Sequence, residues 1–299
     1  MTCLVIGLRV LFKMNLDREI KILIKNYRKH SPETIFYKKL KRSIEKKIIS
    51  YFQNYKKQKN LKLGKIATIK FPFFKMGNIN SSHLFGIDEL IIFCFYYLNK
   101  KNYLNSLDLG ANIGLHSLIM TKNKMNVTCY EPDNFHIKQM VKNFKINNCF
   151  KKVKIKKKAV SNHRGKVKFL RILGNTTGNH IEGSKRKVYG KIEKEIVNCD
   201  NFKSIIKGND FIKMDVEGVE AKLICSTNSK HWINTDAILE IGSFVNAKKI
   251  FSHCNKIRLN IFSQKKNWKQ VNKLKDLPKT YKEGSVFLTS KNNMNWISN

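Results

Sequence analysis

Acidic side chains are scarce in this sequence of 299 residues: 21 Asp and Glu stand against 59 Lys and Arg, a formal net charge of +38. One interpretation is a polyanionic partner, which would be nucleic acid, anionic lipid or a phosphorylated substrate. The other is A/T-rich codon usage, because only eight of the basic residues are Arg while Asn and Ile are abundant. Codon usage explains Lys over Arg better than it explains the shortage of acids, so both interpretations stay open.

Metal-ligand spacings are also missing. The seven cysteines include no CxxC pair and no Cys/His cluster at zinc spacing, and the histidines form no HxxxH pair. This excludes a structural zinc site of the usual kind, and we expect free thiols in a reduced compartment, the cytoplasm. Cys94 and Cys129 stand in apolar runs, which predicts positions in the core.

The sequence lacks a long apolar run at its start. In residues 1–14, MTCLVIGLRVLFKM, an apolar stretch of about ten residues is interrupted by Arg9. It is too short for a bilayer and has neither a basic leader nor a small-residue cleavage site, so we expect no transmembrane segment and no signal peptide. Met14 opens a more ordinary sequence and is a candidate for the true start.

What the chain does contain is enough apolar material to fold. The hydrophobic share is 42% and the aromatic share 11%, whereas a disordered basic tail would be poor in both. Residues 1–60 read as a basic helical extension, in which Ile44, Ile48, Tyr51, Phe52 and Tyr55 recur at helix spacing. Such a helix either packs its apolar stripe on the domain behind it or lies on an anionic membrane or nucleic acid.

Residues 61–299 form the second predicted domain, and its centre alternates between strands and helices. Parallel neighbours need a crossover and helices supply it, so this alternation predicts an α/β fold with a doubly wound, mostly parallel, Rossmann-like sheet. The expected helices are residues 83–101, 113–124 and 135–148, and the expected strands are residues 105–110, 126–132 and 153–161.

The first of these strands runs into a glycine-punctuated loop, DLGANIG. The strand ends at Asp108, Gly110 lets the chain turn sharply, and Gly114 lets the next helix start close to a ligand or the sheet. Asn112 stands where many such loops carry a glycine, and Asn tolerates positive φ well. We expect the backbone amides of this turn to face a ligand.

The second strand ends in Glu131, which follows Asp108 by 131 − 108 = 23 residues. An acidic residue at about that offset reaches ribose hydroxyls in nucleotide-binding folds. Two carboxylates on adjacent strand ends suit the amine and ribose of S-adenosylmethionine. A dinucleotide fits less well, because G-x-G-x-x-G is absent. In the alternative reading both acids are only strand-end turn residues.

Four motifs in order carry a resemblance to a known family: SLDLGANIGLHS, CYEPDNFHIKQMVKNFKINN, KKAVSNHRGKVKF and FIKMDVEGVEAKLI. They resemble the FkbM family of S-adenosylmethionine-dependent methyltransferases over about residues 84–290, most closely over 107–223. The resemblance implies a class I methyltransferase fold and O-methylation of a hydroxyl on a saccharide or secondary metabolite. It also implies a cofactor site built from Asp108, Gly110, Asn112, Gly114 and Glu131, with Ser161 near the adenine.

The segment FIKMDVEGVE predicts the catalytic end of the site. A short apolar strand ends at Asp215, and open α/β sheets bind ligands at the carboxyl ends of their strands. Asp215 is the expected general base or positioning group, with Glu217 assisting. Capping of the next helix and charge at its N-terminus are the alternatives for these two acids. A divalent metal held by them and Glu240 stays open, but no spacing supports it.

Three further features carry weaker predictions. His116, one turn into the first helix, is a third catalytic candidate, although such histidines are more often packed. Residues 171–197 read as a long loop that covers or selects the substrate, with Arg186 available to an anionic acceptor. SVFLTSK reads as an antiparallel edge strand.

Two other functions stay open beside a small-molecule or saccharide O-methyltransferase. A nucleic-acid methyltransferase is favoured by the charge alone, since the sequence has no NPPY-type motif and no Arg-rich stacking surface. A non-catalytic binding protein on the same fold is disfavoured by the intact Asp108, Glu131 and Asp215.

Overall fold

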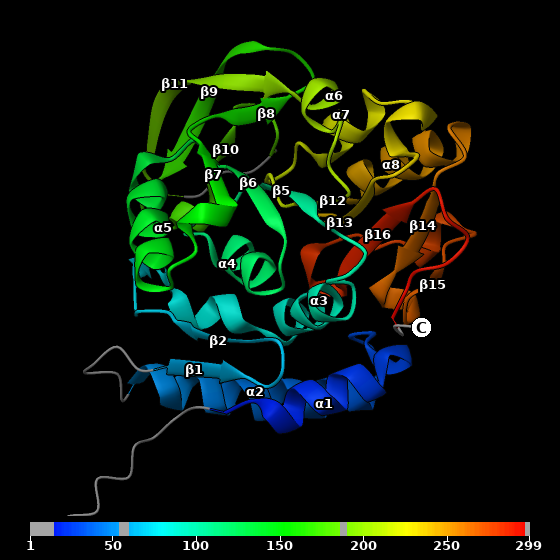
Figure 1. Ribbon diagram of the computed structural model, residues 1–299. Helices are drawn as coiled ribbons and strands as arrows, with labels where there is room; N and C mark the ends of the chain where they lie inside the picture. The colour runs from blue at the N-terminus through cyan, green and yellow to red at the C-terminus, as the bar shows by residue number, and fades with distance from the viewer. Residues whose placement is uncertain (1–14, 54–59, 186–189, 297–299) are drawn as a thin grey trace, which may run out of the picture.

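The computed structural model describes residues 15–53, 60–185 and 190–296 (Figure 1). Met14 and Arg186 lie outside these ranges. Its main feature is a sheet of eight strands, parallel from β7 to β13 and antiparallel beyond. Across the sheet the order is β15 (Lys269–Gln270), β14 (Asn260–Ser263), β16 (Ser285–Thr289), β13 (Asp236–Glu240), β12 (Phe211–Met214), β5 (Asn105–Leu109), β6 (Asn126–Tyr130) and β7 (Val153–Lys156).

Helices cover both faces of this sheet, which confirms the doubly wound α/β prediction (Figure 1). Side chains alternate between the faces along each strand, so Phe211 joins one apolar cluster and Ile212 and Met214 join the other. The first cluster lies under α3 (Ile87–Leu98), α4 (Leu115–Lys122) and α5 (Asn134–Ile146), and the second under α6 (Phe202–Ile205), α7 (Glu220–Cys225) and α8 (Phe244–Lys256).

A second sheet of four strands replaces the long loop predicted for residues 171–197, and that prediction was wrong. Its order is β10 (His180–Ile181), β9 (Gly165–Ile172), β11 (Ile192–Asn201) and β8 (Ala159–Ser161). The long antiparallel pair of β9 and β11 joins residues that are 20 to 34 positions apart in sequence, and most residues of β11 are exposed. Their composition therefore lacks the apolar alternation that marks a strand.

Two smaller strand predictions were also wrong. Residues 153–161 do not form one strand, because the chain bends between Lys156 and Lys158. At this bend the backbone N–H of Lys158 donates to the carbonyl of Lys156 (2.8 Å). β7 therefore stays in the main sheet and β8 enters the second one. β16 is antiparallel as expected, yet it lies between β13 and β14 instead of at the edge. All five of its residues are buried, as an interior strand requires.

The chain before α3 forms two helices, α1 and α2, within residues 17–53 and then four short strands, and the two helices pack beneath α3 (Figure 1). Ile44, Ile48, Tyr51 and Phe52 are buried, so the apolar stripe of the second helix packs against the rest of the chain. The boundary near residue 60 stays a prediction, as does Tyr55, which is outside the described ranges. The elements are α1 (Asp17–Lys25), α2 (Ile35–Gln53), β1 (Asn60–Leu63), β2 (Ala67–Lys70), β3 (Lys75–Met76) and β4 (Ile79–Asn80).

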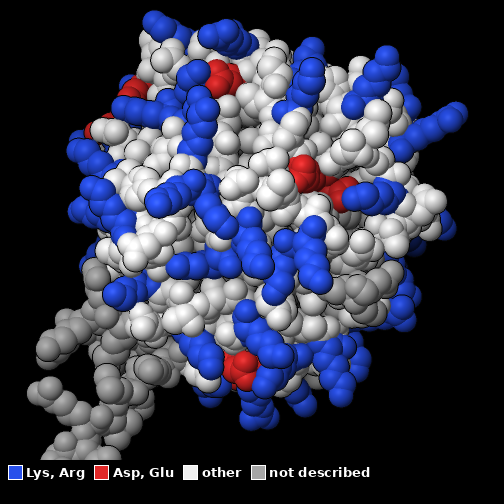
Figure 2. Space-filling view, viewed as in Figure 1, with Lys and Arg blue, Asp and Glu red and all other residues white. Residues whose placement is uncertain are grey.

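The surface is dominated by basic side chains. Figure 2 shows Lys and Arg spread over the visible face with few acidic side chains between them. Within the described ranges, no helix is both long and apolar enough to cross a membrane. Cys94 and Cys129 are buried free thiols as predicted, whereas Cys225 is exposed.

Candidate active site

One pocket lies where the carboxyl ends of β5, β6 and β12 meet the second sheet. Its empty space, including the part open to solvent, is about 580 Å³. The position agrees with the general rule for open α/β sheets. Residues from both sheets line it: Gly110, Asn112, Tyr130, Glu131, Pro132, His136, Lys158, Ala159, Val160, Phe169, Thr176, Thr177, Asn179, His180, Ile181, Asp215, Val216 and Glu217.

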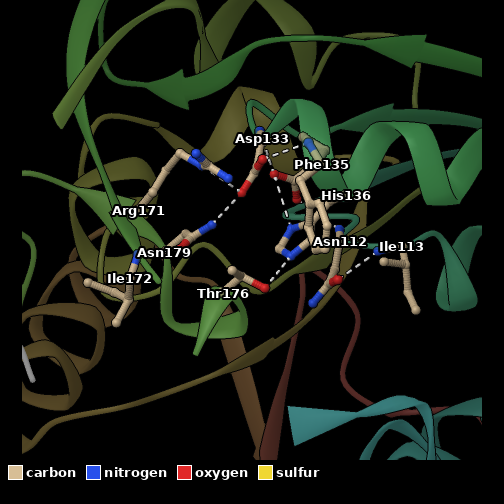
Figure 3. Close-up of polar contacts among 10 residues, drawn as sticks. Asn112, Ile113, Asp133, Phe135, His136, Arg171, Ile172, Thr176 and Asn179 are labelled. Atoms are coloured by element: carbon tan, nitrogen blue, oxygen red, sulfur yellow. Dashed lines mark hydrogen bonds and ion pairs between the residues drawn. The ribbon is translucent and has the colours of Figure 1, made fainter. Parts of the chain in front are cut away.

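The loop after β5 forms one wall and has the backbone geometry that the sequence predicts. Gly110 has φ +76°, and a Cβ there would lie 1.9 Å from the backbone oxygen of Asp215, so only glycine fits. Asn112 has φ +52°, and its side-chain oxygen accepts the N–H of Ile113 (2.7 Å) (Figure 3). The loop is thereby held tightly against the end of β12.

Gly114 serves helix packing and does not line the pocket. It has φ +81°, and a Cβ there would lie 2.6 Å from Met140 Cγ and 2.9 Å from the Phe144 ring, both on α5. We expected this glycine to let α4 start close to a ligand or the sheet. In the structure it instead lets the start of α4 pack closely against α5.

Glu131 follows β6 and connects the loop to the next helix. One carboxylate oxygen accepts the N–H of Asn112 (2.9 Å) and the other accepts the N–H of Asp133 (2.8 Å). The side chain is buried and borders the pocket. Since a carboxylate offers about four acceptor positions, Glu131 keeps capacity for a ligand hydroxyl.

Two predicted cofactor residues lie beside the pocket instead of lining it. Asp108 is buried beneath the loop, where one oxygen accepts the Ser117 hydroxyl (2.5 Å) and the other has no partner among the described residues. Ser161 is buried at the end of β8, and the pocket is lined by Ala159 and Val160 just before it.

The second sheet closes the pocket through the segment Thr176 to Ile181, which is anchored to α5 (Figure 3). Asp133 caps α5 by accepting the N–H of Phe135 (2.8 Å), and its other oxygen accepts Asn179 Nδ2 (2.7 Å) and Arg171 Nε (3.2 Å). One buried carboxylate therefore fixes both the helix start and the covering segment.

A second anchor lies beside the first. His136 of α5 shares a hydrogen bond with the Thr176 hydroxyl (2.9 Å), at the start of the covering segment (Figure 3). Its other ring nitrogen lies 3.8 Å from a Glu131 oxygen. The cover, α5 and the end of β6 therefore form one polar network around the pocket.

Asp215 and Glu217 border the pocket on a turn that directly follows β12. Glu217 has φ +54° and pairs with Lys185, which follows the covering segment in the chain. Burial and the neighbouring Asp215 raise the pKa of Glu217 to about 7, although Lys185 opposes the shift. The turn therefore presents two carboxylates to the same space.

Glu220 holds this turn from behind. Its carboxylate accepts the backbone N–H groups of Val216 (3.1 Å) and Gly218 (3.0 Å). Burial raises its pKa to about 7, partly offset by these hydrogen bonds. Glu220 is fully engaged by backbone, so Asp215 and Glu217 are the acids available to a ligand.

Comparison with known proteins decides the family. The sequence model described as methyltransferase FkbM domain matches residues 108–265, more than half of the chain. The chain belongs to the FkbM family of S-adenosylmethionine-dependent methyltransferases. Its doubly wound, mostly parallel sheet agrees with the fold that the family resemblance implies. No curated protein matches the chain significantly.

Solved methyltransferase structures resemble this FkbM-family chain at low identity. An FkbM methyltransferase from Methylobacillus flagellatus KT is 14% identical, with TM-score 0.38, over 62% of this chain and 44% of that one. The StiE O-MT structure is 10% identical, with TM-score 0.36, over 60% and 54%. A precorrin-6y C5,15-methyltransferase from Geobacter metallireducens GS-15 is 9% identical, with TM-score 0.36, over 67% and 85%. The chain spans less than half of the first of these, and likenesses at these scores carry nothing about substrate.

The residues around the pocket fit the cofactor that the family implies. The glycine loop gives close backbone approach, Glu131 keeps free acceptor positions, and the second sheet adds an apolar wall suited to a flat base. That wall consists of Ala159, Val160, Phe169 and Ile181. Among the residues that the structure describes, no group of three or more His, Cys, Asp or Glu is placed to hold a metal ion.

Lys213 is a site residue that the sequence analysis missed. It lies inside β12, almost fully buried, with Nζ 3.3 Å from an Asp215 oxygen. Burial lowers its pKa, but Asp215, Asp108, Glu89 and Glu240 together raise it above the ordinary value. A lysine within the apolar run FIKM was the available signal, because an unpaired lysine is almost never buried.

His116 is placed differently from a catalytic base. One ring nitrogen bonds the Tyr96 hydroxyl (2.9 Å) and the other lies 2.7 Å from a Glu89 oxygen, and His116 does not border the pocket. Both nitrogens are occupied, so the ring is suited to hold Glu89. No sequence signal marked Glu89, since an acid in the first turn of a helix is explained by the helix dipole.

Proposed function

We propose that this FkbM-family protein transfers the methyl group of S-adenosylmethionine to a hydroxyl of a small, neutral acceptor, of the saccharide or secondary-metabolite kind. The observation that carries the proposal is Asp215, which stands at the pocket directly after β12 and pairs with the buried Lys213. A carboxylate held in a fixed position next to a bound hydroxyl can accept its proton.

The cofactor end of the pocket is assigned to the first two strand ends. Gly110 and Asn112 belong to the loop whose backbone lies against the cofactor. Glu131 accepts hydrogen bonds from the ribose hydroxyls. Asp108, Gly114 and Ser161 support this arrangement from beneath and beside the pocket.

The acceptor end is assigned to the turn after β12. When bound, S-adenosylmethionine supplies a methyl group that is already activated by the sulfonium charge. In this proposal Asp215 receives the proton of the acceptor hydroxyl, and Lys213 Nζ, 3.3 Å from an Asp215 oxygen, holds that carboxylate in position. Glu217 helps to orient the acceptor, and its pairing with Lys185 closes the second sheet over it.

The charges near Asp215 favour a neutral acceptor. Glu217 and Glu240 both have raised pKa values, first because of burial and second because of Asp215, and Glu89 adds to the effect at Glu240. An anionic group placed among these carboxylates would meet repulsion at short range. Lys213 and Lys185 are themselves paired with Asp215 and Glu217, so neither lysine is left to pair with an anionic acceptor.

The direct test is a methyl-transfer assay with labelled S-adenosylmethionine and a panel of neutral polyols, phosphorylated sugars and polynucleotides. We expect transfer to neutral hydroxyl compounds, and Asp215→Asn should lower kcat by about 10²–10⁴-fold while cofactor affinity stays within about twofold. Asp17→Asn, in α1, is the control with unchanged turnover. Full activity of Asp215→Asn, or preferential methylation of polynucleotides, would contradict the proposal.

A further inference from the structure

His180 has a ring nitrogen that nothing in the described structure satisfies. The residue is only 2% exposed, and its Nε2 has no hydrogen-bond partner among the described residues. Of the buried side-chain atoms left unpaired in those ranges, it is the one whose residue lines the pocket. A buried polar atom without a partner costs about 1–3 kcal/mol, which a bound ligand can recover.

The partner of the other nitrogen fixes what Nε2 can do. Nδ1 lies 2.8 Å from the carbonyl oxygen of Gly178, and a carbonyl only accepts, so Nδ1 carries the proton. Burial, aided by Lys185, lowers the pKa of His180 despite that bond, which keeps the ring neutral. Nε2 is therefore an acceptor, and its missing partner is an N–H or O–H donor.

The surroundings narrow the choice of donor. Ile181, next to His180, pairs across the sheet with Phe169, and both line the pocket with Ala159 and Val160. These side chains form an apolar wall that suits the flat faces of a purine, whereas the ribose hydroxyls have Glu131. The donor that a purine of this cofactor presents at its edge is the 6-amino group.

We propose that His180 is a specificity residue that accepts a hydrogen bond from the adenine 6-amino group of the cofactor. The proposal rests on the proposed function, since it needs the adenosyl group in this pocket. His180 thereby makes the covering segment of the second sheet part of cofactor recognition, and it rejects bases with an oxygen at the same position. A site with a buried acceptor discriminates strongly against a ligand that lacks the donor.

The test is isothermal titration of the full chain with S-adenosylhomocysteine and with its 6-oxo analogue, S-inosylhomocysteine. The wild-type chain should prefer the amino compound by about 10-fold or more. His180→Met, which removes the acceptor, should bring this preference close to one, whereas His180→Gln, which keeps an acceptor oxygen, should retain most of it. His253→Met is the matched control, because His253 also bonds a backbone carbonyl but does not line the pocket.

Each outcome has a distinct meaning. Equal weakening of both ligands in His180→Met, with thermal unfolding like that of His180→Gln, would overturn the proposal and leave His180 a packing residue. A His180→Met chain that binds both ligands as tightly as the wild-type chain, with the same preference for S-adenosylhomocysteine, would overturn the proposal as well. Failure of the wild-type chain to bind S-adenosylhomocysteine would remove the proposed function and this inference with it, whereas binding without discrimination would remove only the inference.

Discussion

At the scale of single residues, the molecule keeps charged and polar side chains buried where they are paired. Lys213 is stable inside β12 because carboxylates on the same face of the sheet and on α3 compensate its burial. Replacing Lys213 or one of these carboxylates alone would leave an uncompensated buried charge, which typically costs several kcal/mol of folding stability. The acceptor end is therefore an electrostatic unit, and single substitutions within it act on more than one residue.

His30 gives a prediction on pH. The ring is fully buried, donates from Nε2 to the carbonyl of Leu23 (3.0 Å) and accepts the Trp268 N–H at Nδ1 (3.0 Å). Burial lowers its pKa from 6.5 to about 4. The unfolded chain then binds the proton more readily, so the contribution of this histidine to stability is intact above pH 6.5 and is lost as the pH falls toward 4.

Between pH 7 and pH 4.5 the wild-type chain should lose about 2–3 kcal/mol more of its unfolding free energy than the His30→Gln chain loses. Denaturant unfolding at several pH values measures it. The comparison uses the slopes with pH, because His30→Gln also loses packing at every pH. Identical slopes for the two chains would contradict a neutral buried His30.

The residues of the cofactor loop could be predicted because their signal is local. The glycine spacing in DLGANIG and the acid after the next strand marked Gly110, Asn112 and Glu131, which border the pocket. Their cofactor-binding role stays a prediction. His180 could not be predicted, since its burial depends on the pairing of β10 with β9 and on contacts with the main sheet. Glu89 was missed because its role arises from the packing of α3 on α4.

At the scale of elements, the second sheet is the feature that the sequence did not reveal. The first half of β11 is exposed on all five residues, Ile192 to Ile196, and the sheet forms only when β11 pairs with β9 on one side and with β8 on the other. Parallel strands with intervening helices have strong local patterns, whereas this sheet depends on contacts between distant segments. The central fold was therefore predictable and the cover of the pocket was not.

Asp133 is the point where that cover is attached, and it carries an element-scale prediction. Asp133→Ala removes the cap of α5 and the partner of Arg171 and Asn179, so it should cost about 2–4 kcal/mol of stability. Hydrogen exchange should become faster in residues 172–181, because their anchor is lost.

Ser243→Ala is the matched control for this experiment. Ser243 caps α8 by accepting the N–H of Asn246 (3.2 Å) and makes no contact of this kind with the second sheet in the described structure. It should cost about 1 kcal/mol and leave exchange in residues 172–181 unchanged. Equal exchange rates in Asp133→Ala and Ser243→Ala would show that Asp133 does not hold the cover.

At the scale of the whole molecule, the basic net charge of the chain contrasts with the acidic residues that border its pocket. The chain has a net charge of +38, and its basic side chains spread over the surface (Figure 2). The proposed acceptor end of the pocket is nevertheless bordered by two acids, Asp215 and Glu217. The global charge therefore says more about the surroundings in which the protein works than about its acceptor.

The central claim is that the pocket after β5 and β6 binds S-adenosylmethionine, and isothermal titration of the purified chain tests it most directly. We expect binding at one site per chain with no binding of NAD. Glu131→Ala should abolish this binding, because it removes the ribose acceptor and the partner of the Asn112 and Asp133 amides. Asp215→Asn should still bind once its thermal unfolding shows a folded chain, because Asp215 is assigned to the acceptor end of the pocket. Absence of binding to the wild-type chain, or undiminished binding to Glu131→Ala, would contradict the account.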